Sequence, residues 1–251
     1  MSARMNERQK QIVNLLQSVG EVKITELKEM FPVTDMTLRR DLEKLEQHGM
    51  LRRTYGGAIL NSKELALPVR STVNMPGKER VGQIAVSLVN PGESIFIDSG
   101  STTLQIARAL PDKAPITVVT NAIHVAAELS EKQIPTVVIG GVLLETTNGM
   151  GGTVATESIS RMAFDKAFLG TTGLSRLHGF SNANMLEAEI KRVAISRASE
   201  SYIVMDNTKF DHSALFSFAK LDEVHAVITN EQPSEEWKAA FREAEVEIRY
   251  S

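Results

Sequence analysis

The chain has 251 residues with a formal net charge of −3, and 42% of its residues are hydrophobic. This length can hold one large domain, or a small domain followed by a medium one. The sequence contains no cysteine, which excludes disulfides, thiolate metal sites and cysteine nucleophiles, and its five histidines are scattered without metal-ligand spacing. It shows no signal-peptide pattern and no apolar stretch of membrane length, so we expect a cytoplasmic protein with no membrane contact, metal or cofactor.

The charge divides unevenly along the chain. Residues 1–60 hold ten Lys and Arg against eight Asp and Glu, whereas residues 61–251 hold 18 against 23. A mildly basic end on an acidic body fits a DNA-binding domain joined to a second domain. We predict a DNA-binding domain at 1–60, a polar linker with two prolines at 61–77, and an α/β domain at 78–251 whose first apolar helix begins near Lys78.

The N-terminal part shows helical patterns with clear starting signals. Asn6 and Gln9 have the spacing of a capping box, and apolar residues then recur at helical intervals. A short apolar strand follows, and Thr25 is the predicted N-cap of a second helix that ends at Pro32.

A third helix and a hairpin complete this small domain. Thr34 is the predicted cap of the helix, whose apolar stripe consists of Leu38, Leu42 and Leu45. The segment from Met50 to Gly57 predicts a β-hairpin that turns at a pair of glycines. This order of elements predicts a winged helix-turn-helix, mainly α, whose third helix keeps one surface free.

The free surface of the third helix suits the reading of DNA bases. Its outward, N-terminal end presents Asp35, Met36, Thr37, Arg39 and Arg40. A recognition helix presents this end to the major groove, where arginine can pair with guanine and a threonine methyl can contact thymine. The predicted phosphate contacts lie in the hairpin and are Arg52, Arg53 and Tyr55. The alternative is that the arginines only form a solvated face and that Thr34 only caps the helix.

These residues resemble the N-terminal signature of the DeoR family of bacterial regulators. The matching positions are Thr37-Leu38-Arg39-Arg40-Asp41-Leu42, Leu45-Glu46, Gly49, Leu51, Arg53 and Gly56-Gly57-Ala58. The resemblance implies that the TxRRDL segment lies on the recognition helix and that the GGA turn belongs to the wing. Met36 stands where the family commonly has a small or polar residue, and Tyr55 where it commonly has histidine.

In the remainder of the chain, short apolar runs alternate with helical patterns. The predicted strands are 94–98, 116–120, 136–140, 167–170, 202–206 and 225–229, and the predicted helices are 102–110, 122–129, 154–162, 187–198 and 234–243. This alternation indicates a mainly parallel sheet covered on both faces. In such sheets ligands bind at the carboxyl ends of the strands.

Several polar or glycine-rich clusters fall at these strand ends. The residues are Asp98, Ser99, Gly100, Ser101, Thr102, Thr103, Thr120, Asn121, Gly140, Gly141, Glu187, Lys191 and Lys209. Hydroxyls and backbone N–H groups between a strand and a helix form an anion cradle. Taken singly, each has a simpler explanation as a helix cap, a turn glycine, a helical ion pair or a surface lysine.

The second part also resembles the C-terminal sensor domain of the DeoR family. The matching segments are Ile97–Thr103, Thr120-Asn121, Gly140-Gly141, Asp165–Gly170, Glu187–Glu189, Lys191-Arg192, Asp206 and Lys209-Phe210. The resemblance implies a fold similar to ribose-5-phosphate isomerase and the CoA transferases, and an effector that is a phosphorylated sugar. It places the phosphate on the Ser99–Thr103 loop and the sugar among the strand-end residues, although Ser99 and Ser101 depart from the family's usual choices.

The leading hypothesis is a ligand-controlled repressor of carbohydrate genes that binds double-stranded operator DNA as a homo-oligomer, a dimer or a tetramer. A sugar-phosphate isomerase with an added DNA-binding domain is the second hypothesis, because Asp98, Glu187, Lys191 and Lys209 could move protons. An architectural DNA-binding protein without a small-molecule site is the third.

Overall fold

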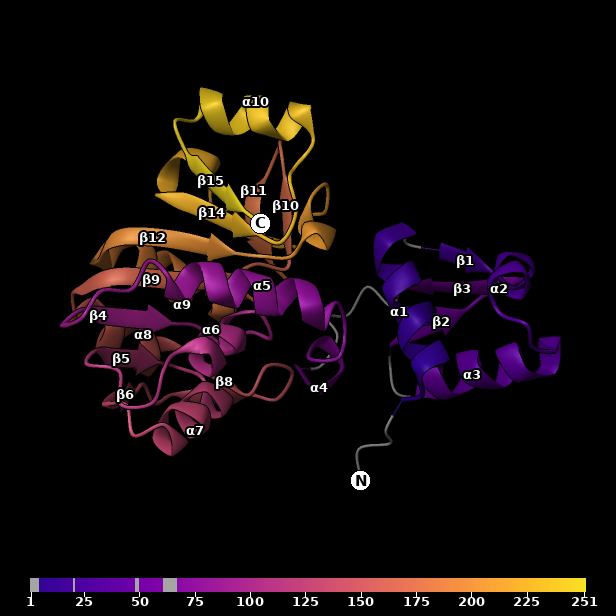
Figure 1. The fold of residues 1–251 in the computed structure, drawn as a ribbon, viewed down its shortest axis with the longest axis horizontal. Helices are drawn as coiled ribbons and strands as arrows, with labels where there is room; N and C mark the ends of the chain where they lie inside the picture. Colours follow the sequence, from indigo (N-terminus) through magenta and orange to yellow (C-terminus); the bar gives the residue numbers. More distant parts are fainter. Residues whose placement is uncertain (1–4, 20, 48–49, 61–66) are drawn as a thin grey trace. The chain divides into compact units, whose positions relative to one another are not determined.

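The computed structural model describes residues 5–19, 21–47, 50–60 and 67–251 (Figure 1). It divides the chain into two compact units, Met1–Asn74 and Met75–Ser251. Gly49 and residues 61–66 of the predicted linker lie outside the described residues. Within the described ranges, no helix has the length and apolar character needed to cross a membrane.

The first unit is a winged helix-turn-helix. Its elements are α1 Glu7–Val19, β1 Glu21–Lys23, α2 Ile24–Met30, α3 Asp35–Gln47, β2 Leu51–Arg53, β3 Gly57–Leu60 and α4 Leu67–Arg70. The three strands pair antiparallel in the order β1-β3-β2. The core is formed by buried aliphatic residues of α1, α2 and α3, including the predicted stripe of Leu38, Leu42 and Leu45.

Two of the three predicted helix starts in this unit are confirmed. The Gln9 N–H donates to Asn6 Oδ1 at 2.9 Å and Gln9 Oε1 accepts from the Asn6 N–H at 3.1 Å, which forms the capping box. The Thr37 N–H donates to Thr34 Oγ1 at 3.3 Å.

The predicted cap at Thr25 is wrong, because α2 begins at Ile24 and its N-cap is Lys23. The chain enters α2 directly from β1. The Ile24 N–H donates to the carbonyl of Gly56, and the Lys23 N–H donates to Glu26 Oε2 at 2.9 Å. Strand pairing therefore fixes the start of the helix before Thr25 is reached.

The second unit is built on a parallel sheet of seven strands. Their order is β15 Glu247–Tyr250, β14 Ala226–Thr229, β12 Ala198–Val204, β9 Phe164–Gly170, β4 Ser94–Ile97, β5 Thr117–Thr120 and β6 Thr136–Val138. Figure 1 shows them stacked from β15 at the top to β6 at the bottom. All six predicted strands are confirmed as members of this sheet, and every pairing in it is parallel.

Helices cover both faces of the sheet, as predicted. The helices are α5 Met75–Val86, α6 Thr103–Ala109, α7 Ile123–Glu131, α8 Thr153–Ser160, α9 Met185–Arg197 and α10 Glu235–Glu243. Ile95 and Ile97 of β4 pack in one cluster with α5, α6 and α7, whereas Phe96 packs in another with α8, α9 and α10. Each strand thus buries alternate residues on opposite faces.

Several shorter elements complete this unit. They are the hairpin of β7 Val142–Leu144 and β8 Gly149–Gly151, the antiparallel sheet of β10 Gly173–Ser175, β11 Gly179–Asn182 and β13 Phe216–Ala219, and the short 3-10 helices η1 Asn207–Lys209 and η2 Leu221–Glu223. The sequence patterns predicted none of these strands. The helix α5 begins at Met75, three residues before the predicted position at Lys78.

Candidate DNA-binding and effector sites

The inner face of α3 holds one carboxylate together with its leucines. Asp41 is buried; its Oδ2 accepts from Arg8 Nε at 2.6 Å and its Oδ1 accepts from Gln9 Nε2 at 2.8 Å. These contacts join α3 to α1. The acidic residue of the TxRRDL segment therefore fixes the helix in place, and the opposite side of α3 stays exposed.

The first turn of α3 holds three of the predicted DNA-contact residues, and two of them, Asp35 and Thr37, have local partners. The Lys28 ammonium of α2 lies 2.7 Å from the Asp35 carboxylate and lowers the pKa of that carboxyl below its usual value. Thr37 is half-buried, and its hydroxyl lies 3.0 Å from that of Thr34. These interactions stabilise the turn between α2 and α3.

The remaining predicted residues of α3 are free to reach outward. Met36 is 67% exposed, and Arg39 and Arg40 are both exposed. Neither arginine forms an ion pair or hydrogen bond with any residue that the structure describes. Two unpaired cations next to an exposed apolar side chain form a surface that can contact DNA.

The wing is the hairpin of β2 and β3. Its predicted phosphate-contact residues Arg52, Arg53 and Tyr55 are all exposed. Arg53 is also tied to α3: Glu46 Oε2 accepts from its Nε at 2.7 Å and Glu46 Oε1 accepts from its backbone N–H at 2.8 Å. Position 57 must be glycine because a Cβ there would lie 1.9 Å from the carbonyl oxygen of Val22.

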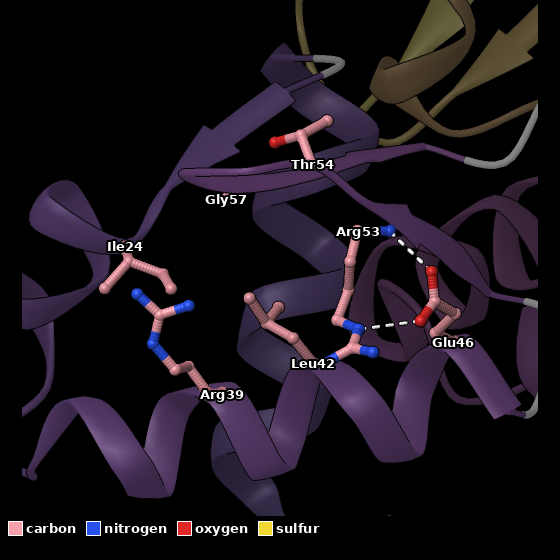
Figure 2. A pocket seen from close by; sticks show the side chains of 7 residues that line it. All are labelled: Ile24, Arg39, Leu42, Glu46, Arg53, Thr54 and Gly57. Carbon is pink, nitrogen blue, oxygen red and sulfur yellow. Dashed lines mark hydrogen bonds and ion pairs between the residues drawn. The ribbon is translucent and has the colours of Figure 1, made fainter.

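A cleft of about 250 Å³ separates α3 from the wing (Figure 2). Its lining residues are Ile24, Arg39, Leu42, Glu46, Arg53, Thr54 and Gly57. Figure 2 shows Arg39 rising from α3 towards Ile24, and Arg53 descending from the wing to Glu46. The lining thus combines two cations and one carboxylate with two largely buried aliphatic side chains.

In the second unit, the predicted effector residues meet at the carboxyl edge of the sheet. Asp98 follows β4, Asn121 follows β5, and Gly170 ends β9. The register places Ile97 beside both Thr120 and Phe168, so the residues that follow these positions are close neighbours. The expectation that ligands bind at the carboxyl ends of parallel strands therefore identified residues that are far apart in the sequence and close in the structure.

The centre of this edge is a buried ion pair. Asp98 Oδ2 accepts from the Lys191 ammonium of α9 and from the Gly170 N–H at 3.1 Å. Glu187 is one turn earlier on α9, and its Oε2 accepts from Asn182 Nδ2 at 2.6 Å. All four charged or amide side chains are buried, so they form a polar cluster inside an otherwise apolar unit.

Some oxygens of this region are buried without a hydrogen-bond partner among the described residues. They are Asp98 Oδ1, Asn121 Oδ1, Thr147 Oγ1 and Asn182 Oδ1. Asp98 Oδ1 points towards the loop, because it lies 3.7 Å from where a Cβ on Gly100 would stand. Buried acceptors and hydroxyls are nearly always satisfied in folded proteins. The cluster can therefore form further hydrogen bonds with a polar ligand or an ordered water molecule.

The loop from Ser99 to Thr103 forms one side of this cluster. Ser99, Ser101 and Thr102 are buried, and Thr102 stands at the N-cap of α6 without a side-chain capping bond. The Thr103 hydroxyl donates instead to the carbonyl of Asp98 at 2.9 Å, and the Thr120 hydroxyl donates to that of Ile97 at 2.6 Å. These two threonines hold the loop and strand end together.

The predicted glycines lie after β6. Gly140 and Gly141 are exposed, and Gly141 has a φ of +149°. A Cβ on Gly141 would lie 2.5 Å from the carbonyl oxygen of Gly151, whereas one on Gly140 would meet nothing within 4 Å. Packing of the β7–β8 hairpin is thus sufficient to account for Gly141.

Lys209 belongs to a second group of charged residues, together with Asp206 and Lys78. Of these, Lys78 was not among the site residues predicted from the sequence. Asp206 is fully buried after β12, and its Oδ2 lies 3.9 Å from the buried ammonium of Lys78 on α5. Burial alone would raise the pKa of Asp206, but Lys209 and Lys78 outweigh it and the pKa is lowered. Lys78 lies near the predicted start of this helix, and nothing in its local pattern reveals that it points inward.

Asn182 and Thr147 were also missed. Asn182 ends β11, in the small antiparallel sheet that no pattern predicted, and Thr147 lies between β7 and β8. A local signal existed for Asn182, since it lies in the polar Ser181–Asn184 stretch directly before α9. Thr147 lies in a similar polar stretch, Glu145–Asn148, between the two strands of a hairpin that was not predicted.

Comparison with known proteins adds to this geometry. A family model described as the DeoR-like helix-turn-helix domain matches residues 8–64, and one described as the DeoR C terminal sensor domain matches residues 73–231. A solved ribose 5-phosphate isomerase A from Methanocaldococcus jannaschii aligns over 55% of each chain at 17% identity with a TM-score of 0.41.

Curated relatives match along nearly the whole chain. The HTH-type transcriptional regulator YulB of Bacillus subtilis strain 168 is 32% identical, covering 89% of this chain and 88% of its own. The lactose phosphotransferase system repressor of Streptococcus mutans serotype c is 30% identical, covering 97% and 99%. The HTH-type transcriptional regulator GlpR of Haloferax volcanii is 31% identical, covering 89% of each chain.

A winged helix-turn-helix with an exposed arginine pair, followed by a sensor domain with a polar cluster at its sheet edge, defines a ligand-responsive transcription regulator. The chain belongs to the DeoR family of transcriptional regulators.

Proposed function

We propose that this regulator represses genes of carbohydrate metabolism, and that a phosphorylated sugar or related metabolite bound in the second unit controls its binding to operator DNA. The observation that carries the effector half is the buried cluster around Asp98 and Lys191, with its unsatisfied oxygens. The name of the Streptococcus mutans relative, a lactose phosphotransferase system repressor, supports the sugar class.

The proposed ligand lies with its phosphate on the Ser99–Thr103 loop and its hydroxyls towards the ion pair. The loop offers buried hydroxyls that make no capping bond, which favour an anion. Asp98 Oδ1 and Asn121 Oδ1 offer acceptors for sugar hydroxyls. The carboxylates of this cluster could also move protons, so turnover of a sugar phosphate by the purified protein would contradict a purely regulatory role.

The repeated half-sites of operator DNA determine the oligomeric state that we propose. Operators usually repeat a half-site, so a dimer or tetramer of this chain would bind two copies of the site. An effector that prefers one arrangement by about 1–3 kcal/mol changes operator occupancy about 5- to 150-fold.

A thermal-shift screen with phosphorylated sugars and their unphosphorylated parents tests the effector site. A ligand at about 100 times its dissociation constant adds roughly 2.7 kcal/mol of stability, so we expect a raised Tm with a phosphorylated sugar only. An unmoved Tm across the panel would favour a purely architectural DNA-binding protein.

The substitution Thr102→Glu places a negative charge in the proposed phosphate loop. We expect it to abolish the ligand-induced Tm shift and leave operator binding intact, because the first unit, which holds the winged helix-turn-helix, is a separate compact unit. Thr117→Glu is the matched control, since Thr117 is exposed at the opposite, amino end of β5. If Thr102→Glu still responds to the effector, the phosphate binds elsewhere.

A further inference from the structure

The cleft between α3 and the wing carries an excess of positive charge. Its lining contains the two cations Arg39 and Arg53 and the single carboxylate of Glu46; in Figure 2 Arg39 reaches towards Ile24, and Arg53 reaches towards Glu46. Arg39 forms no hydrogen bond or close ion pair within the described part of the chain, although its charge helps to lower the pKa of the Asp35 carboxyl. Two guanidinium groups that share one small cleft repel each other, and an anion between them would relieve that repulsion.

Glu46 fixes the direction in which Arg53 reaches. The carboxylate accepts one hydrogen bond from the backbone N–H of Arg53 and one from its Nε, at 2.8 and 2.7 Å. These bonds lower the pKa of the Glu46 carboxyl and raise that of the Arg53 guanidinium. Because the Glu46 carboxylate accepts its side-chain hydrogen bond from Nε, the N–H donors of the two terminal Nη groups of Arg53 remain available for another acceptor.

The position of the cleft matches the path of a DNA strand. An α-helix in the major groove is flanked by phosphate backbones on both sides, because the groove is only about 12 Å wide. A wing that stands beside the helix therefore meets a backbone, and the cleft between them opens towards it. The cleft has a volume of about 250 Å³, which leaves room for a phosphate group. This volume lies below the roughly 300–1,000 Å³ of typical small-molecule sites.

We propose that this cleft binds one backbone phosphate of the operator, that Arg39 and Arg53 are its ligands, and that Glu46 is the residue that positions Arg53. The proposal rests on operator binding as the function of the first unit. It moves Arg39 from base reading to phosphate binding and leaves base reading to Arg40. The carboxylate of Glu46 thus aids DNA binding despite its negative charge.

Arg39→Ala separates phosphate binding from base reading. The probes are a duplex selected by the full-length protein from a random-sequence pool, and a scrambled duplex of the same composition. A phosphate contact predicts that affinity falls by a similar factor on both duplexes, and that the slope of log affinity against log salt decreases by about 0.9. Loss on the selected duplex alone would overturn the assignment of Arg39.

Glu46→Ala and Arg53→Ala form a double-mutant cycle with their double variant. If Glu46 acts by positioning Arg53, each single change weakens binding about 5-fold, and Glu46→Ala costs nothing further in the Arg53→Ala background. An undiminished effect of Glu46→Ala in that background would overturn the positioning role. This readout also separates positioning from a general loss of folding, which would persist in both backgrounds.

Glu43→Ala is the matched control, because Glu43 is exposed on the same helix, does not line the cleft, and acts on Arg53 through its charge without the hydrogen bonds that Glu46 accepts. Removing either carboxylate takes one negative charge from the DNA-facing unit. Simple electrostatics predicts that both changes strengthen binding, whereas our proposal predicts a gain for Glu43→Ala and a loss for Glu46→Ala. A gain of equal size for both would overturn it. If the wild-type protein selects no duplex from the pool, the proposed function fails first.

Discussion

The recognition helix contains two neighbouring arginines whose surroundings differ. Arg39 lines the cleft beside the wing, whereas Arg40 is exposed on α3 outside that lining. Successive residues of a helix point about 100° apart, so the two side chains meet different parts of a duplex. This difference assigns them separate roles in spite of their identical chemistry.

Arg40→Ala tests the base-reading role at this scale. A guanidinium that pairs with a base edge contributes about 1–3 kcal/mol of discrimination, so we expect that loss on the selected duplex and little change on a scrambled one. Fluorescence anisotropy at fixed salt measures both affinities. Unchanged binding to the selected duplex would remove Arg40 from the contact surface.

Asp206 predicts how the second unit responds to acid. Burial opposes ionisation of Asp206, but the positive charges of Lys209 and Lys78 prevail, so its pKa is lower in the folded chain than in the unfolded one. The unfolded chain therefore binds more protons at low pH, and the stabilisation from this group is present above about pH 4 and lost as the pH falls through the folded pKa. Denaturant unfolding followed by the single tryptophan, Trp237, measures this dependence.

Asp206→Asn is expected to lower stability near neutral pH by about 3 kcal/mol, because it leaves a buried ammonium without its carboxylate. It should also flatten the loss of stability in acid. Asp222→Asn is the control, since Asp222 is exposed. A pH profile identical to that of the wild type would show that Asp206 is not the group involved.

At the scale of elements, the wing depends on a close approach of two backbones. Gly57 pairs with Lys23 of β1, and a Cβ at Gly57 would overlap the carbonyl of Val22. We expect Gly57→Ala to destabilise the three-stranded sheet by about 3 kcal/mol and to weaken DNA binding. Gly56→Ala is the matched control because nothing lies within 4 Å of its Cβ position. Hydrogen exchange in β1 and β3 measures the effect, and equal protection in both variants would contradict this account.

Local patterns were sufficient to predict most of the elements. The leucine stripe of α3 and the cap at Thr34 depend only on residues a few positions apart, and both were found. The cap at Thr25 was misplaced because the start of α2 depends on pairing between β1 and β3, about 35 residues away in sequence. In the sheet of β10, β11 and β13, the pairing of β11 with β13 likewise joins distant segments, whereas β10 and β11 form a local hairpin whose strands of three and four residues are too short to show a clear alternation.

The candidate effector site shows the same division. Asp98 and Lys191 are separated by 93 residues, yet both were named because one rule places strand ends together and because each matches the family's pattern. Lys78 reaches Asp206, and Asn182 reaches Glu187, from elements whose orientation is set by packing. No local sequence pattern predicts that the side chains of Lys78 and Asn182 are buried.

At the scale of the whole molecule, helix α5 lies in the chain between the DNA-binding unit and the candidate effector site. The helix α5 begins at Met75, directly after the boundary between the units. It packs closely on α6, because a Cβ on Gly82 would lie 2.8 Å from Gln105. Since α6 follows the proposed phosphate loop, a ligand that shifts α6 would move the element next to the junction.

Titration of the full-length protein with selected and scrambled duplexes, with and without a stabilising sugar phosphate at about 0.15 M salt, tests the central claim most directly. We predict that the protein prefers the selected duplex by at least about 10³-fold, and that the sugar phosphate changes this affinity by about 5- to 150-fold. Equal affinity for the two duplexes, whether or not the metabolite is present, would contradict the account.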